Sequence, residues 1–208
     1  AEEFAELKKR GIAYHPIGFS AKDPFSKDNL RAFLQMRKLL QKENYTLIHC
    51  HTPITAFFTR LAAQKYRRKN KTKVIYTSHG FAFTKNGGKI QNFLYRTAET
   101  FASLYTDMII TINEEDFLAA KKFPCRNVRK ISGVGVDSER FHRMPADVQE
   151  CKKALGLPED KHIILSVGEI SERKNHQVII RAMAQLKRDD LHYMIAGVGP
   201  KADALMAL

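Results

Sequence analysis

The 208-residue chain is long enough to bury a core, and 44% of its residues are hydrophobic. It has no uninterrupted apolar run near the roughly 18 residues that a membrane span needs, which predicts a soluble or peripheral protein. Its cysteines, Cys50, Cys125 and Cys151, lack CxxC spacing. This argues against a disulfide framework or a structural zinc site and favours a reducing compartment.

Positive charge is concentrated in the N-terminal two-thirds of the chain. Residues 1–139 hold 24 Lys and Arg against 13 Asp and Glu, whereas residues 140–208 hold 11 against 9. A basic surface of this kind suits an anionic membrane, at about 1 kcal/mol per basic residue near the headgroups, or a nucleic acid. For the run KYRRKNKTK (65–73), a solvated helix end and loop is an equally good interpretation.

Strand-like runs alternate with amphipathic helical patterns along the chain. The chain opens in a helix-like segment without an initiator Met, and because an α/β domain usually opens with a strand, we expect both ends to be truncated. Strands are predicted at 46–51, 73–78, 107–113, 127–132, 162–168 and 191–197. Helices are predicted at 26–43, 54–66, 90–105, 114–123 and from 172 onward. This alternation predicts parallel sheets with helices on both faces.

Two of the predicted helices carry clear start signals. Ser26 and Asp28 are candidate caps of the first, in which Leu30, Phe33, Leu34 and Leu40 are expected to face a core. The helix at 114–123 opens with three acidic residues, which complement the positive end of a helix dipole. A glycine-containing stretch at 133–145 predicts the junction between a domain at 1–138 and a second domain at 139–208.

Polar residues and glycines follow the predicted strands, where ligands bind in open parallel sheets. In the first domain these residues are His49, His51, His79, Gly133 and Gly135. In the second they are Gly168, Glu169, Arg173, Lys174, Gly197 and Gly199. Their common placement predicts a cleft between two domains.

Each of these features also has a simpler interpretation. A glycine after a strand is most often only a turn. His49 and His51 point to one face of their strand, and they could form a metal half-site with His79 or line a sugar or phosphate pocket. Arg173 and Lys174 could be a solvated turn, but at a helix N-terminus they would direct positive charge toward phosphate oxygens. The remaining histidines, His176 among them, are expected to be structural or exposed.

Six motifs in order carry a resemblance to a known family. They are HCHTP (49–53), YTSHGFAF (76–83), YTDMIITINEED (105–116), ISGVGVD (131–137), LSVGEISERKNH (165–176) and IAGVGP (195–200). Together they resemble the GT-B glycosyltransferases of family 4, especially those of bacterial capsule and exopolysaccharide synthesis. The resemblance implies an α/β protein of two Rossmann-like domains with parallel sheets, both incomplete in this chain.

The resemblance also implies a reaction. The N-terminal domain would hold the acceptor and the C-terminal domain a nucleotide-sugar, usually a UDP-sugar, and transfer would retain the anomeric configuration without a metal or other cofactor. The implied acceptor is a lipid-linked sugar or a glycan, handled in the cytoplasm by an enzyme held peripherally at the inner face of the bacterial membrane. An anionic membrane surface is therefore an expected partner, and a nucleic acid is not.

Site residues follow from the motifs one by one. Lys174, with Arg173 beside it, matches the basic position that contacts the donor diphosphate, and His79 matches the catalytic histidine near the reacting sugar. His49 and His51 would line the acceptor side. The implied donor-binding backbone positions are Gly133, Gly135, Gly168, Glu169, Gly197 and Gly199.

The match to the family is incomplete. Glu169 stands where many members have Arg, and Ala82 stands where close relatives often carry a second histidine. The family's paired glutamates would lie beyond Leu208 and its first glycine loop before Ala1. This chain alone is therefore expected to be inactive, and the full-length protein to be a hexosyltransferase.

Three other functions fit parts of the sequence. A GT-B sugar-nucleotide epimerase would share the fold and the histidine-lined cleft. A metal-dependent hydrolase would use His49, His51 and His79 as ligands. A basic, non-enzymatic α/β module would bind nucleic acid with strong salt dependence.

Overall fold

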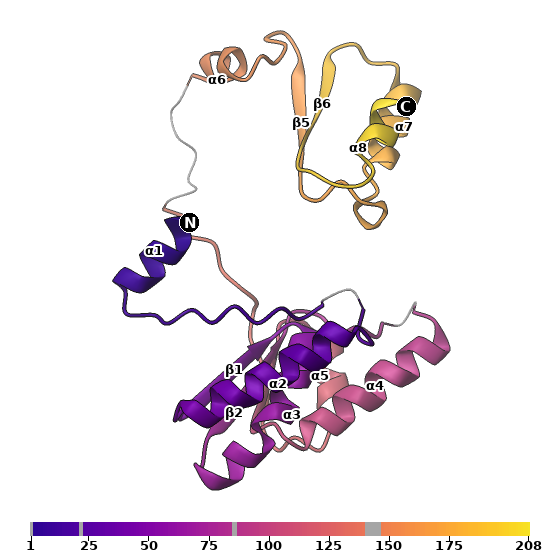
Figure 1. Cartoon of the computed structure of the whole chain (residues 1–208). Helices are drawn as coiled ribbons and strands as arrows, with labels where there is room; N and C mark the ends of the chain where they lie inside the picture. The colour runs from indigo at the N-terminus through magenta and orange to yellow at the C-terminus, as the bar shows by residue number, and fades with distance from the viewer. Residues whose placement is uncertain (1, 21–22, 85–86, 140–146) are drawn as a thin grey trace. The chain divides into compact units, whose positions relative to one another are not determined.

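The structure is a computed structural model that describes residues 2–20, 23–84, 87–139 and 147–208. The chain divides into two compact units, Ala1–Val136 and Asp137–Leu208, and each is described here by itself (Figure 1). The division lies close to the predicted boundary after residue 138. Residues 140–146 of the predicted junction lie outside the described residues.

Unit 1 contains a four-stranded parallel sheet. Its strands are β1 (Leu47–His51), β2 (Lys73–Ser78), β3 (Met108–Thr111) and β4 (Val128–Lys130), in the order β1-β2-β3-β4. All four lie within predicted strands, whose Val and Ile content favours a pleated, buried surface. In the parallel register His51 is paired with Thr77, so the ends of β1 and β2 that carry the candidate residues are neighbours.

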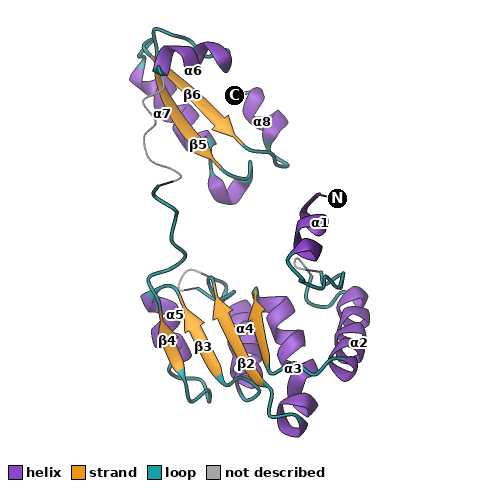
Figure 2. Cartoon of the chain, turned by 90° about the vertical axis from the view of Figure 1, so that its left-hand side faces the viewer, coloured by secondary structure: helices purple, strands orange, loops and turns teal. Residues whose placement is uncertain are grey.

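The described helices of unit 1 are α1 (Glu2–Lys9), α2 (Lys27–Lys42), α3 (Pro53–Lys69), α4 (Lys89–Ser103) and α5 (Glu114–Ala120). Of these, α3, α4 and α5 cover one face of the sheet. Helix α3 contacts β1 and β2, and α5 contacts β3 and β4. Figure 2 shows α3, α4 and α5 behind the strands. The prediction of helices on both faces is wrong for the described residues of unit 1, where Leu47 on the opposite face of the sheet is 51% exposed.

Helix α2 begins as predicted, and its predicted core face is confirmed in part. The Ser26 hydroxyl accepts a hydrogen bond from the Asp28 N–H, so Ser26 is the N-cap. Leu40 is buried and Phe33 packs against the core, as predicted. Leu30 and Leu34 are exposed, contrary to the prediction, and Asn29 and Ala32 are buried instead. Asn29 is buried because its side chain accepts from the Ser20 N–H and donates to the Asp23 carbonyl, which fixes the rotation of α2 about its axis.

An ion pair lies at the centre of the helical layer. The Arg60 guanidinium is fully buried, donates to Glu99 at 2.8 Å and to the Ala56 carbonyl at 3.0 Å, and lies 4.2 Å from the centre of the Tyr76 ring. Burial raises the pKa of Glu99, and the Arg60 charge opposes that shift. The pair joins α3 to α4 where both meet β2, and a buried charge of this kind is stable only while its partner remains.

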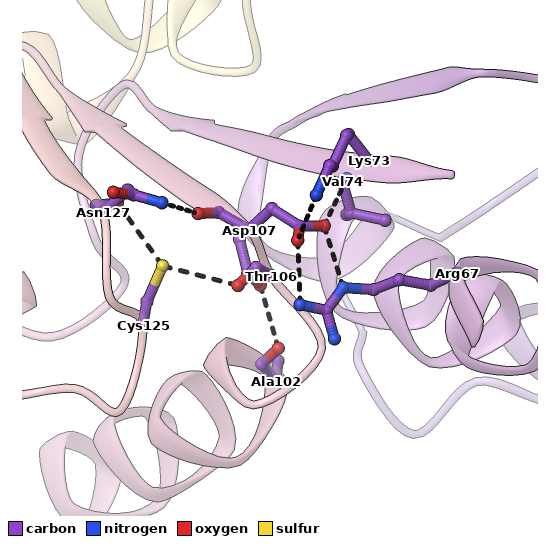
Figure 3. A network of polar contacts seen from close by, with 8 residues as sticks. All are labelled: Arg67, Lys73, Val74, Ala102, Thr106, Asp107, Cys125 and Asn127. Atoms are coloured by element: carbon purple, nitrogen blue, oxygen red, sulfur yellow. Dashed lines mark hydrogen bonds and ion pairs between the residues drawn. The ribbon is translucent and has the colours of Figure 1, made fainter. Parts of the chain in front are cut away.

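A polar network fixes the amino ends of the strands (Figure 3). Asp107 accepts two hydrogen bonds from Arg67, at 2.8 and 2.9 Å, and one from the Val74 N–H at 2.9 Å. Its backbone carbonyl accepts from the Asn127 side chain. The hydrogen bond from Arg67 holds the pKa of Asp107 below its ordinary value of 3.8. Arg67, which belongs to the basic 65–73 run, is thus a structural residue that joins the end of α3 to the sheet.

Unit 2 contains a two-stranded parallel sheet of β5 (His162–Val167) and β6 (Leu191–Ala196). Its helices are α6 (Val148–Ala154), a 3-10 turn η1 (Glu172–Lys174), α7 (Gln177–Leu186) and α8 (Ala202–Met206). The helix predicted from residue 172 therefore begins as a 3-10 turn. Asn175 takes the left-handed conformation after that turn, at φ 50°, and the α-helix starts at Gln177. Among the described residues of unit 2, only His176 is buried.

The cysteines differ between the units. Cys50 and Cys125 are buried in unit 1, whereas Cys151 is exposed on α6 of unit 2, and all three are free thiols. Burial raises the pKa of the Cys50 thiol to about 11. No helix in the described part of the chain has both the length and the apolar character needed to cross a membrane.

Candidate functional site

Three histidines meet at the carboxyl ends of β1 and β2. His51 Nδ1 and His79 Nε2 are 3.0 Å apart and share a hydrogen bond. The rings of His49 and His51 lie 4.3 Å apart, centre to centre, and His49 Nε2 is 2.8 Å from the Thr77 hydroxyl oxygen. The structure therefore brings the predicted catalytic residue His79 together with both predicted acceptor-side histidines.

The contact between His51 and His79 limits which protonation states the two rings can have together. A hydrogen bond between two imidazole nitrogens needs one donor and one acceptor, so the two rings cannot both be fully protonated while it persists. Partial burial and the nearby imidazoles of His49 and His79 lower the pKa of His51 below its ordinary value of 6.5. When both rings are neutral, their hydrogen bond leaves one free N–H and one free ring nitrogen, so the pair can donate to one substrate group and accept from another.

The backbone next to these histidines is strained. Thr52, directly after β1, has φ 61°, a conformation that β-branched residues rarely adopt. Its hydroxyl donates to the His51 carbonyl at 2.6 Å, and Pro53 then begins α3. Strain of this kind concentrates at functional sites, where it fixes the direction of a loop. Thr52 was not predicted as a site residue, although its Thr-Pro pair between a strand and a helix was a usable signal.

Asp116 holds the loop that carries His79. This buried carboxylate accepts from the Phe81 N–H at 3.1 Å and from the Asn113 side-chain amide at 3.0 Å, and it lies 3.4 Å from the Ser78 hydroxyl. An acid in the first turn of α5 was predicted from the helix dipole, but this long-range role was not. Loss of Asp116 would release the loop between β2 and α4 at both sides of His79.

The histidine geometry does not support the metal-dependent hydrolase. A nitrogen of His51 and one of His79 point at each other rather than at a common third point. Across residues 2–20, 23–84, 87–139 and 147–208, no group of three or more His, Cys, Asp or Glu side chains is arranged to hold a metal ion. That transfer needs no metal remains a prediction.

Two glycine turns meet at the carboxyl end of the unit 2 sheet. Gly168 follows β5 at φ 150°, where other residues are strained. A Cβ on Gly197 would collide with the Gly168 carbonyl oxygen, and one on Gly199 with the carbonyl oxygen of Ile170. The backbone bond from the Ile170 N–H to the Val198 carbonyl, at 3.0 Å, joins the two turns. These glycines are required by backbone contact and not only as turn residues.

The basic residues of the predicted donor site follow the first of these turns. The Lys174 side chain folds back over Gly168, with Nζ 3.9 Å and Cε 3.6 Å from the place that a Cβ on this glycine would occupy. Arg173 points to the Glu169 carboxylate, with 4.0 Å between Nη2 and Oε2, and both side chains are exposed. The structure thus groups Gly168, Glu169, Arg173 and Lys174 around one turn.

The buried side chain of His176 links this turn to β6. His176 Nδ1 is 3.1 Å from the Tyr193 hydroxyl, and its Nε2 is 3.3 Å from the Glu169 carbonyl oxygen. The Tyr193 hydroxyl donates to Ser166 at 2.9 Å. His176 is therefore structural, one of the two roles predicted for it, and its link between the glycine turn and β6 was not foreseen because its partners are 7 and 17 residues away.

Gly133 and Gly135, the other predicted donor-binding residues, lie after β4 near the end of unit 1. Gly133 has φ 105°, and a Cβ on Gly135 would meet no atom within 4 Å. A Cβ on Gly133 would also meet no atom within 4 Å, so packing within unit 1 requires neither glycine. The positive φ of Gly133 still favours glycine there, whereas the structure shows no such reason at Gly135.

Comparison with protein families identifies the class to which this arrangement belongs. Residues 2–113 match the family described as glycosyl transferase 4-like, and residues 147–208 match the family described as glycosyl transferases group 1. The chain belongs to the family 4 glycosyltransferases of the GT-B fold.

Among curated proteins the chain is similar to a putative glycosyltransferase, EpsD, of Bacillus subtilis (strain 168), with 40% identity over 86% of this chain and 48% of EpsD. It is also similar to the UDP-Gal:alpha-D-GlcNAc-diphosphoundecaprenol alpha-1,3-galactosyltransferase of Escherichia coli, with 33% identity over 71% of this chain and 38% of that enzyme. The chain thus spans about half or less of the length of these relatives.

Solved structures show the same fold. Anabaena Alr3699/HepE in complex with UDP matches 98% of this chain and 53% of its own, with a TM-score of 0.68 and 14% identity. Sucrose-phosphate synthase from Thermosynechococcus elongatus matches 87% of this chain and 44% of its own, with a TM-score of 0.64 and 16% identity. At these identities the likeness establishes the fold alone.

Proposed function

We propose that a protein of the relatives' length containing this chain transfers a sugar from a UDP-sugar, with retention of configuration, to a lipid-linked or polysaccharide acceptor. The step breaks the bond between the anomeric carbon and a diphosphate oxygen and forms one from that carbon to an acceptor hydroxyl oxygen, whose proton is released. The chain belongs to a family of glycosyltransferases, and its role in polysaccharide synthesis is part of this proposal. The donor, the acceptor and the stereochemistry are the proposal.

The placement of Lys174 is the observation that carries this proposal. Its ammonium group lies over the Gly168 turn at the carboxyl end of β5, 3.9 Å from the place that a Cβ on this glycine would occupy. A diphosphate leaving group gains negative charge as the glycosidic bond breaks, and a fixed cation stabilises that charge most in the transition state. Arg173 adds a second positive charge beside it. The solved relative that holds UDP supports a uridine nucleotide as donor.

In this proposal the histidines of unit 1 serve the sugar and the acceptor. His79 donates a hydrogen bond to the donor sugar or takes part in proton transfer, and His51 and His49 line the acceptor side. The lipid-diphosphate acceptor in the name of the E. coli relative supports a lipid-linked acceptor. The excess of positive charge in residues 1–139 supports a peripheral position on the anionic inner face of a bacterial membrane.

The test is a transfer assay with UDP-sugars in a protein of the relatives' length that contains this chain. We expect Lys174→Ala to lower turnover by about 100-fold or more. Lys153→Ala, which removes an exposed lysine paired with Glu159 on the same unit, should leave it unchanged. Unchanged turnover with Lys174→Ala would remove this residue from the donor site. Isomerisation of a UDP-sugar without any acceptor would instead identify an epimerase.

A second variant tests the histidine group. We expect His79→Ala to lower turnover more than donor affinity, because His79 belongs to unit 1 and is assigned to the reacting groups. If the variant is unfolded by circular dichroism, His79 is a structural residue and this part of the proposal fails.

A further inference from the structure

Helix α4 has its apolar side on the outside. Its buried residues are Glu99, Ala102 and Ser103, which are polar or small. Its large apolar residues are exposed, with Ile90 at 80% and Phe93 at 70%, followed by Leu94 and Phe101. Helical spacing places these four on the side opposite the buried one. A helix with this inverted distribution presents its apolar side to something other than water.

This apolar side continues into a groove of about 1100 Å³. One wall is α4, and the other is the start of α3 together with Pro24 and Phe25. The lining is almost entirely hydrocarbon and includes Phe25, which is 89% exposed, as well as Phe57, Phe58, Phe93 and Phe101.

The other flank of α4 is cationic. A second cavity, of about 550 Å³, lies between α4 and α5 and is lined by Lys89, Arg96 and Lys122, with Glu115 as its one acid. All three cations are exposed, and Arg96 lies over the Phe83 ring at 5.3 Å. Lys89 and Phe93 line both cavities, so positive charge and exposed apolar surface meet along a single helix.

We propose that the surface formed by α4, the apolar groove and the Lys89–Arg96–Lys122 cavity docks on an anionic phospholipid bilayer. The apolar side of α4 would enter the boundary between headgroups and acyl chains, and the three cations would contact lipid phosphates at its flank. Charge complementarity favours this occupant over a neutral protein surface, because the exposed apolar residues lie beside a net excess of cations. The inference rests on the membrane association proposed above and assigns it to α4 instead of the basic 65–73 run.

The test measures binding of this chain to vesicles by flotation, so it is independent of transfer activity. We expect binding to phosphatidylglycerol-containing vesicles and weak binding to phosphatidylcholine alone. The double variant Ile90→Ser/Phe93→Ser should lower the partition constant by about tenfold or more. Both residues are exposed, so the fold should persist, which circular dichroism checks.

A pair of charge variants separates α4 from the basic run. Lys89→Gln/Lys122→Gln should weaken binding by about tenfold or more. The matched control Lys65→Gln/Lys69→Gln removes the same charge near the far end of α3, about 15 Å along the helix from the groove, and should cost less than about threefold.

Each remaining outcome overturns the proposal. If the chain binds phosphatidylglycerol vesicles and the control variant loses binding instead, membrane association stands and α4 is not its surface. If no vesicle binding occurs, the docking proposal and the membrane association both fail, while sugar transfer is still tested by the separate assay. If sedimentation shows a dimer that Ile90→Ser/Phe93→Ser makes monomeric, a second copy of the chain covers this side.

Discussion

Unit 1 and unit 2 both end their parallel strands in loops that carry candidate site residues, but they fix these loops by different means. In unit 1 the loops and helices are fixed by buried polar side chains, chiefly Asp116 and the Arg60–Glu99 pair. In unit 2 the glycine turns touch through their backbones, and His176 is the only described side chain of the unit that is buried. The stability of unit 1 should therefore fall when a buried polar group is removed. The stability of unit 2 should fall when a methyl group is added to one of its glycines.

The largest expected effect is in unit 1, from Glu99→Ala. This change leaves the guanidinium of Arg60 buried without its partner, and because arginine does not lose its proton, the cost should be about 3–5 kcal/mol of unfolding free energy. Urea unfolding followed by circular dichroism measures it. Arg60→Met combined with Glu99→Leu should recover most of the loss, and failure to do so would mean that the ion pair is not the cause.

The next largest loss of stability is expected in unit 2, from Gly197→Ala. The new Cβ would collide with the Gly168 carbonyl, so the two turns must separate, at about 2–3 kcal/mol. Hydrogen exchange of the amides of β5 and β6 should accelerate, with those of unit 1 unchanged. Gly135→Ala is the control, because its Cβ would meet no atom within 4 Å. Equal effects of the two changes would contradict the backbone contact.

A smaller effect is expected from Asp107→Asn, about 1–2 kcal/mol, because hydrogen bonds from Arg67 and Val74 to a charged group become weaker. Folding lowers the pKa of Asp107, so its contribution is complete above the unfolded value of 3.8 and is lost as the pH falls through the lower folded value. The variant should therefore flatten the acid limb of stability against pH. If the loss of stability at low pH is the same in the variant, other carboxylates are responsible for it.

The smallest effect concerns the titration of His51. Since its pKa is lowered, the folded state favours the neutral ring, and the associated stability is present above pH 6.5 and declines as the pH falls. Nuclear magnetic resonance of the imidazole protons should give a midpoint below 6.5 for His51. His79→Gln should move it upward, because a nearby titrating ring is removed. A midpoint that does not respond to this change would contradict the contact between the two rings.

The strands and most helices could be predicted because their signals are local. Runs such as KVIYTS at 73–78 favour strands by composition, and Ser26 caps its helix within two residues. The rotation of α2 could not be predicted in this way. Its buried face depends on Asn29, whose polar partners lie in an irregular segment that has no periodicity to read.

The candidate site was predicted in part for the same reason. The rule that polar residues gather at the carboxyl ends of parallel strands was enough to bring His49, His51 and His79 together. The strain at Thr52 and the hydrogen bond from the Phe81 N–H to Asp116 depend on tertiary packing, which local patterns do not show. Phe81 and Asp116 are 35 residues apart in the sequence. The inverted side of α4 was also missed, because a helical pattern shows which residues share a side but not whether that side faces the core.

Because of where the cysteines lie, the thiols of the two units should react with a thiol reagent at different rates. A thiol reagent added to the native protein should modify Cys151 at once, since this residue is exposed, and Cys50 and Cys125 only when unit 1 opens. Because burial also keeps Cys50 protonated, its labelling reports opening with little background reaction from the folded state. Mass spectrometry of the singly and triply labelled chain would thus follow the opening of unit 1 without any engineered probe, with the prompt label on unit 2 as an internal reference.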